Sequence, residues 1–290
     1  MTSPAGPLSA EDRFRNERIH ALRMHALQVR TLTDCPSLMT TNFYAPPSAI
    51  QDRRVMLPDE EARHVHTVLR GEAGDEMVVV DGEGGWYRVR IDHTTPEQVV
   101  GTIVEQRKDV GEPAVDVTVA LGLLKKRSRF ETFVEKAVEL GVHRIVPLRT
   151  VHTEPELVRE ERLRNLMVAA MKQCRRSWLP DVAAPQSPEA LLAASEAEIR
   201  LVCHAGDDAV PIRRAVDEAS PVSSALVLVG PEGGFAPSEV DAAVAVGCRP
   251  VSLGARRLRA ETAGLVALQA VVGSTGGGAE ANPERRGQNG

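Results

Sequence analysis

Two short stretches near the C-terminus carry residues whose types and spacing suit ligand binding. The first is GPEGGF at 230–235, directly after an apolar strand expected over 226–229. Its glycines let a ligand approach the main chain, and ligands of open α/β sheets bind at such carboxyl ends of strands. The turn has neither GxGxxG nor the Lys-Ser/Thr pair of a phosphate loop. It therefore predicts a ligand not held by its phosphates, with a bare strand-to-helix turn as the alternative.

The second stretch, LGARRLRAETA at 253–263, contains one of three groups of basic residues in the chain. These are Lys125, Lys126, Arg127 and Arg129, then Lys172, Arg175 and Arg176, and finally Arg256, Arg257 and Arg259. The net charge of −5 argues against a nucleic-acid partner, because phosphate binding is driven by basic surface. A solvated basic face is the ordinary meaning of one such group. Three groups beside expected strand or helix ends favour a shared anionic partner.

Composition restricts the class of protein further. The 290 residues are 42% hydrophobic and 26% charged, which is typical of one large or two ordinary globular domains. The four cysteines form no CxxC pair, so neither a disulfide framework nor a zinc site is indicated, and a reducing cytoplasm fits best. His64 and His66 are two apart and would point to opposite sides of a helix, so no metal is expected. No apolar run or signal-like segment suggests a membrane.

Local patterns divide the chain into four parts. Residues 1–41 mix Arg, His and Pro and predict a poorly ordered extension, or a start codon placed too far upstream. Residues 42–111 read as a small β-rich domain with a hairpin, its strands over 77–80 and 86–91. Residues 112–273 alternate strands and helices, which predicts a mainly parallel sheet. Residues 274–290 lack a core-forming pattern and predict a disordered tail.

In GPEGGF and LGARRLRAETA the chain resembles the bacterial 16S rRNA uridine N3-methyltransferases of the RsmE type, in the SPOUT superfamily. The first domain adds FYAP at 43–46 and EARHVHTVLR at 61–70 to the resemblance. The second adds LKKRSRF at 124–130, ELGV at 139–142 and the Gln173-Cys174 pair. The resemblance spans about residues 42–272. Departures include Lys172 and Arg175 beside that pair, and Ala236 where a capping serine is frequent.

The resemblance implies an α/β fold: a SPOUT-type parallel sheet with a C-terminal trefoil knot, preceded by a small PUA-like β-barrel domain. It also implies a homodimer that acts on 16S rRNA of the small ribosomal subunit, with S-adenosyl-L-methionine as methyl donor and no metal. On this basis the cofactor would contact two loops and the helix that follows them. These residues are Leu228, Val229, Gly230, Glu232, Gly233, Gly234, Leu253, Gly254, Leu258, Thr262 and Ala263. The loops over 230–234 and 253–258 should then lie side by side around one cavity.

Uridine N3 is weakly acidic, so catalysis requires a group that stabilises the charge spreading to the base carbonyls. Arg259 is the first candidate for that role and Arg256 the second. Glu261 would orient the arginine or act on the proton. Without the resemblance, the segment over 259–262 would read equally as an ordinary helix start with an ion pair.

Eight basic residues are candidates for phosphate contacts, which position an RNA without choosing the base. They are Arg70, Lys125, Lys126, Arg127, Arg129, Lys172, Arg175 and Arg176. Two other functions stay open from the sequence. The first is a non-catalytic RNA-binding or ribosome-assembly protein that retains this fold, and the second is an unknotted nucleotide-binding enzyme of doubly wound type.

Overall fold

The structure is a computed structural model that describes residues 38–153, 159–206 and 208–275, and main chain only at 38–40. The expected tail and the extension lie outside these residues, apart from 274–275 and 38–41. Strand β1 begins at Leu38, before the expected start of the first domain. The described residues from 39 onward belong to one compact unit.

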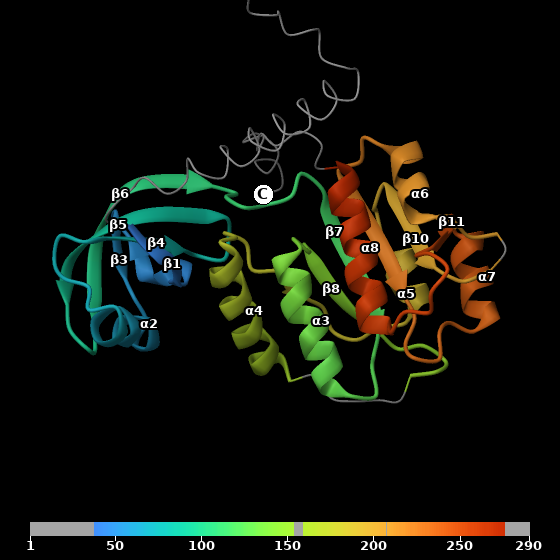
Figure 1. The fold of residues 1–290 in the computed structure, drawn as a ribbon, viewed down its shortest axis with the longest axis horizontal. Coiled ribbons are helices and arrows are strands. Elements are labelled where there is room, and N and C mark those ends of the chain that lie inside the picture. The colour runs from blue at the N-terminus through green and yellow to red at the C-terminus, as the bar shows by residue number, and fades with distance from the viewer. Residues whose placement is uncertain (1–37, 154–158, 207, 276–290) are drawn as a thin grey trace, which may run out of the picture. The chain divides into compact units, whose positions relative to one another are not determined.

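The first sheet contains six strands in the order β1-β4-β5-β6-β3-β2 (Figure 1). Their bounds are β1 (Leu38–Tyr44), β2 (Ile50–Gln51), β3 (Arg54–Met56), β4 (Glu76–Val80), β5 (Gly85–Thr94) and β6 (Val99–Lys108). The expected hairpin is confirmed, because β4 and β5 pair antiparallel around the turn at 81–84. Strands β1 and β2 are the outer strands, so the described pairs make an open sheet rather than the expected closed barrel.

A short helical segment covers this sheet. A 3₁₀ turn, η1 (Pro47–Ala49), precedes β2, and α2 (Asp59–Arg63) continues into the π-helical turn η2 (His64–Val68). The His64 ring packs edge-on against the buried Phe43 ring, with centroids 5.8 Å apart. Nδ1 of His66 lies 3.1 Å from the hydroxyl of Thr94. Both histidines therefore stabilise this part of the fold.

The second sheet contains seven strands in the order β11-β13-β10-β12-β7-β8-β9, and all its neighbours pair in parallel. Their bounds are β7 (Asp116–Gly122), β8 (Arg144–Leu148), β9 (Asp181–Val182), β10 (Ile199–Cys203), β11 (Val210–Pro211), β12 (Ser224–Val229) and β13 (Arg249–Ser252). The alternation of strands and helices thus predicted the parallel sheet. The α/β class is confirmed.

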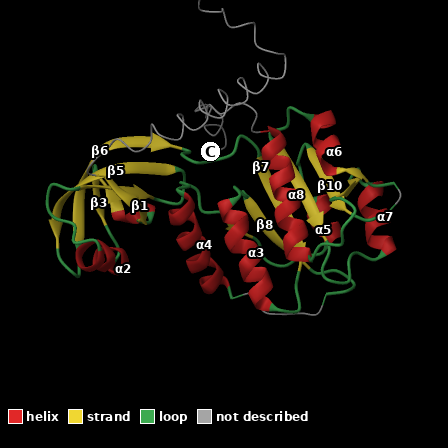
Figure 2. Ribbon diagram, viewed as in Figure 1, coloured by secondary structure: helices red, strands yellow, loops and turns green. Residues whose placement is uncertain are grey.

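Helices cover both faces of this sheet (Figure 2). They are α3 (Arg127–Glu139), α4 (Glu160–Cys174), α5 (Pro188–Ala193), α6 (Ile212–Ala219), α7 (Pro237–Ala245) and α8 (Ala260–Thr275). Alternate residues of β12 point to opposite faces of the sheet. Val227 belongs to the core that contains residues of α3, α4, α6 and α8, whereas Leu226 belongs to the core that contains residues of α5 and α7. Helix α6 was not expected from the sequence. The result is three layers around two apolar cores.

Helices α3 and α8 lie side by side on one face (Figure 1). Gly264 of α8 allows this approach, because a Cβ atom there would lie 2.7 Å from the Phe133 ring of α3. The Phe133 ring is fully buried. This contact packs α8 against α3, and α8 also contacts β7 and β12.

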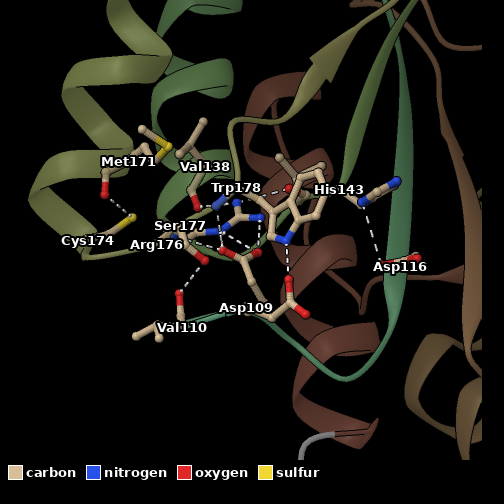
Figure 3. A network of polar contacts seen from close by, with 12 residues as sticks. Asp109, Val110, Asp116, Val138, His143, Met171, Cys174, Arg176, Ser177 and Trp178 are labelled. Atoms are coloured by element: carbon tan, nitrogen blue, oxygen red, sulfur yellow. Dashed lines mark hydrogen bonds and ion pairs between the residues drawn. The ribbon is translucent and has the colours of Figure 1, made fainter. Parts of the chain in front are cut away.

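A buried polar network joins the end of α4 to the segment after β6 (Figure 3). The Arg176 guanidinium is only 3% exposed; it donates to Glu112 at 2.7 Å and to the carbonyls of Val138 and Val142. The Trp178 indole donates to Asp109 at 2.5 Å. The expectation that Arg176 contacts RNA is therefore wrong, since its charge is buried and neutralised by Glu112.

Candidate active site

The two expected loops meet at the carboxyl edge of the parallel sheet. The segment after β12 and the segment after β13 line a single cavity of about 670 Å³, as the sequence predicted. The cavity walls come from three stretches, with the end of β10 as the third. Among the candidate residues, the lining includes Val229, Gly230, Glu232, Gly233, Gly234, Leu253, Gly254, Arg256, Leu258, Arg259 and Ala263.

Three glycines shape the first of these loops. A Cβ atom on Gly230 would lie 2.9 Å from the main chain of Gly234 and Phe235, so the loop closes tightly on itself. Gly234 has a φ of 73°, a conformation that residues with side chains rarely adopt. A Cβ atom on Gly233 would lie 3.0 Å from His152, which belongs to the loop after β8. These positions leave main-chain groups close to the cavity.

Two of the residues expected to contact the cofactor do not line this cavity. Leu228 is 1% exposed and points into the core beneath α5 and α7, because side chains alternate along the strand. Thr262 lines a different cavity of about 610 Å³, together with Ile212 and Val266, because it lies on another side of α8. Val229 and Ala263, their neighbours in sequence, do line the expected cavity.

Three arginines of the second loop stand at the cavity: Arg256, Arg257 and Arg259. All three are exposed, and none of their guanidinium groups has a hydrogen-bond or ion-pair partner among the residues that the structure describes. Gly254 precedes them with a φ of 108°, which turns the chain sharply after β13. A cavity with free guanidinium groups suits a ligand that carries or develops negative charge.

Glu261 does not line the cavity. Its side chain is 12% exposed, and its Oε1 lies 3.7 Å from Nε of Arg129 on α3. The other oxygen, Oε2, is buried without a hydrogen-bond partner in the described part of the chain. Glu261, which was expected to orient the arginine or act on the proton, therefore contacts α3 and does not line the cavity.

Arg129 is held between two carboxylates. Its Nη1 lies 3.5 Å from Oε1 of Glu232, and the same oxygen accepts a bond from the Lys125 main-chain nitrogen at 3.3 Å. Glu232 belongs to the first loop and Glu261 to α8, so one guanidinium links both sides of the site. The expectation that Arg129 contacts RNA phosphates is corrected, because both of its ion pairs lie within the protein.

The remaining basic candidates differ in exposure. Arg70, Lys125, Lys126, Arg127 and Arg175 are exposed, and Lys172 is partly exposed. Lys172 forms an ion pair with Glu61 of α2, a residue of the first domain. Glu61 is 7% exposed, which makes this contact part of the packing between α4 and α2.

Two residues outside the candidate list, His152 and Glu239, support the first loop. Nδ1 of His152 lies 3.1 Å from the carbonyl oxygen of Gly234. Glu239 accepts from the main-chain nitrogens of Val151 at 3.0 Å and Ala236 at 2.8 Å, so one carboxylate joins the loop after β8 to the start of α7. The position of Glu239 in the first turn of α7 was a visible signal. No signal in the sequence indicated the contact between His152 and Gly234, because these residues are 82 positions apart.

The fold and the cavity define a class of protein, and comparison with known proteins agrees. Residues 111–272 match the family described as the RNA methyltransferase domain, and residues 57–104 match the RNA methyltransferase PUA domain. The chain is an RNA methyltransferase with a PUA-type domain before its parallel-sheet domain. It belongs to the ribosomal RNA small subunit methyltransferase E family.

The relatives cover most of the chain. The methyltransferase E of Synechocystis is 32% identical over 250 residues, which are 84% of this chain and 80% of that protein. The crystal structure of a probable rRNA methyltransferase from Porphyromonas gingivalis matches with a TM-score of 0.73 at 32% identity, covering 80% of this chain and 98% of that one. The methyltransferase E of Neisseria gonorrhoeae, bound to S-adenosyl methionine, matches with a TM-score of 0.68 at 27% identity over 80% and 96%.

Two further findings concern metals and membranes. Among the described residues, no group of three or more His, Cys, Asp or Glu side chains is arranged to hold a metal ion. Of the helices in the described ranges, none combines the length and apolar character needed to cross a lipid bilayer.

Proposed function

We propose that this protein uses S-adenosyl-L-methionine to methylate N3 of a uridine in 16S rRNA of the small ribosomal subunit. The observation that carries the proposal is the single cavity between the two loops, with its free arginines. Family membership and the cofactor-bound relative from Neisseria gonorrhoeae support the same conclusion. A substrate of this kind would locate the protein in the cytoplasm.

The residues of the cavity fit the methyl donor. Its volume of about 670 Å³ is in the range of small-molecule sites, and its glycines allow main-chain groups to reach a ligand. Val229, Leu253, Leu258 and Ala263 supply apolar contacts. When bound, the cofactor supplies an activated methyl group on a sulfonium. The main-chain groups at Gly230, Gly233, Gly234 and Gly254 would hold it in place.

The arginines would act on the base. As the N3 proton leaves, negative charge spreads to the two carbonyl oxygens of uracil, and a fixed guanidinium stabilises that charge. Arg259 is the proposed residue for this role, with Arg256 as the second choice. Lys125, Lys126, Arg127, Arg70 and Arg175 are the proposed phosphate contacts, and they would orient the rRNA.

The proposal extends to organisation and assembly. The boundary between the two domains is placed at residues 111–112, and the fold is taken to be of the SPOUT type with a C-terminal trefoil knot. Strand β13 pairs between β10 and β11, so the chain leaving β13 must pass the connection that joins those two strands. This strand order supports a knot in which the segment after β13 is threaded through that connection. A homodimer is also proposed, and sedimentation velocity would test it.

The test uses small subunits from cells that lack this gene, with radiolabelled cofactor and mapping of the methylated base. Wild-type protein should bind the cofactor and form one N3-methyluridine. Replacing Arg259 by Ala should lower kcat by about 100-fold or more, as loss of a charge-stabilising donor does elsewhere. Cofactor affinity should change little.

Two outcomes would contradict this function. Absence of both cofactor binding and methyl transfer in the wild type would exclude a methyltransferase. An Arg259→Ala variant that retains cellular function, while charge reversal at Lys125 and Arg127 abolishes it, would favour a non-catalytic assembly protein.

A further inference from the structure

Three side chains able to accept a proton line the cavity within the described ranges: Cys203, His204 and Glu232. Burial raises the pKa of the Cys203 thiol to about 12, so this thiol stays protonated at neutral pH. Nε2 of His204 lies 2.7 Å from the position that a Cβ atom would take on Gly206, so the ring is turned toward its own loop. Glu232 is therefore the group best placed to act on a ligand.

The Glu232 carboxylate is held by one oxygen only. Oε1 accepts from the main-chain nitrogen of Lys125 and lies 3.5 Å from the Arg129 guanidinium. Oε2 has no hydrogen-bond partner among the described residues. The side chain is 27% exposed at the cavity. One oxygen thus fixes the orientation while the other remains available to a hydrogen-bond donor in the site.

Arg129 is itself held in place. Glu261 of α8 binds it from the opposite side at 3.7 Å, and the close contact of Phe133 with Gly264 lies one turn further along the same two helices. The ion pair and the ring contact are successive steps of the α3–α8 interface. This interface makes Arg129 a rigid support for Glu232, because a guanidinium can engage two carboxylates from a single planar group.

Resting on the proposed function, we propose that Glu232 accepts the proton from uridine N3 and that Arg129 is the residue that positions it. The N3–H bond breaks and its proton passes to Oε2 of Glu232. The N3 electron pair forms the new bond to the methyl carbon. The electrons of the broken carbon–sulfur bond return to the sulfur of the methyl donor. The assignment moves the proton-accepting role from Glu261 to Glu232.

The charged groups around Glu232 come from several elements. Arg129 of α3 contacts Glu232, and Glu261 of α8 contacts Arg129. The arginines of the second loop and His204 line the same cavity, and His152 lies against Gly233.

The experiment measures kcat against pH and cofactor affinity by calorimetry for the wild type, Glu232→Gln and Glu232→Asp. In Glu232→Gln we expect kcat to fall by about 100-fold, within the usual range for a lost general base. Cofactor affinity should change less than about threefold. The deficit should shrink as pH rises, because hydroxide then removes the N3 proton without help. Glu232→Asp should recover part of the rate.

Matched variants separate this proposal from its competitors. Glu131→Gln removes a carboxylate on the same helix as Arg129 that is bonded to Arg162 instead, and it should behave as wild type. Arg129→Met should lower kcat, yet the double variant with Glu232→Gln should be no slower than Glu232→Gln alone. That non-additivity identifies a residue that acts through Glu232.

Other results would contradict the assignment of the proton to Glu232. A deficit in Glu232→Gln that does not change with pH, or one confined to cofactor affinity, would make Glu232 a binding residue. A pH-dependent loss in His204→Asn but not in Glu232→Gln would assign the proton to His204. If the wild type itself transfers no methyl group, the proposed function fails and the role of Glu232 is not what has failed.

Discussion

At the scale of single residues, the buried carboxylate of Asp81 holds the turn between β4 and β5 through contacts with nearby residues. Oδ1 of Asp81 accepts from the main-chain nitrogens of Glu83 at 2.7 Å and Gly85 at 2.8 Å, and its Oδ2 accepts from the Tyr87 hydroxyl at 2.9 Å. Burial, followed by this hydrogen bond, raises the pKa of Tyr87 to about 12. The turn between β4 and β5 is therefore fixed by a carboxylate that needs a protonated tyrosine.

The raised pKa of Tyr87 predicts a loss of stability at alkaline pH. The folded state holds the tyrosine proton more tightly than the unfolded state does, so the contribution is complete below pH 10 and disappears as pH rises toward 12. Denaturant unfolding at pH 8 and pH 11 should show a larger loss in the wild type than in Tyr87→Phe, which cannot ionise. Equal losses in both proteins would show that Tyr87 does not contribute.

At the scale of elements, the site depends on how closely α3 and α8 approach. Gly264 of α8 admits the buried Phe133 ring of α3. The helices bring Arg129 and Glu261 together one turn before that contact. A helix pair that packs tightly near the ends of β7 and β12 thus sets the geometry of the cavity wall.

Replacing Gly264 by Ala tests this packing. Alanine favours a helix by about 1 kcal/mol over glycine, but the added methyl would overlap the buried ring. We expect a net destabilisation of about 1–2 kcal/mol, as overpacked cores show, with a loss of kcat. Gly273→Ala in the same helix is the control, since its Cβ atom would meet only the flexible end of Gln269 at 3.2 Å. It should be neutral or stabilising; if both variants behave alike, the close approach does not matter.

At the scale of the whole molecule, a buried ion pair ties the segment after α4 to the connection between the two sheets. Arg176 follows α4 and Glu112 precedes β7, and their side chains are 4% and 5% exposed. Glu112 also accepts from the main-chain nitrogens of Ser177 and Trp178, each at 3.1 Å. The segment that follows α4 is thereby tied to the connection between the two sheets, and the Trp178 indole adds its bond to Asp109.

Removing one partner of the Arg176–Glu112 ion pair should lower the stability of the folded protein. Arg176→Met leaves the Glu112 carboxylate buried without its main partner, so we expect a loss of about 3–5 kcal/mol in the free energy of unfolding. The double variant Arg176→Met with Glu112→Gln should recover much of that loss, because no charge is then buried alone. Thermal unfolding of the three proteins provides the measurement. A double variant as unstable as the sum of the single ones would contradict a direct coupling.

The sequence alone determined the parts of this protein that depend on local chemistry. The β4–β5 hairpin and the parallel sheet follow from periodicity and turn residues, and the resemblance to a known family predicted that the two motif loops lie around one cavity. The hairpin depends on neighbours in the chain, so the order of residues is sufficient to predict it.

Only the tertiary structure decided which charged residues face the ligand. Arg129, Arg176 and Lys172 read as surface cations, yet each meets a carboxylate from a distant segment. Glu261 is turned to α3, whereas Glu232 stands at the cavity. A long charged side chain looks the same in sequence whether it is solvated or paired. Its role is set by the elements that folding brings beside it.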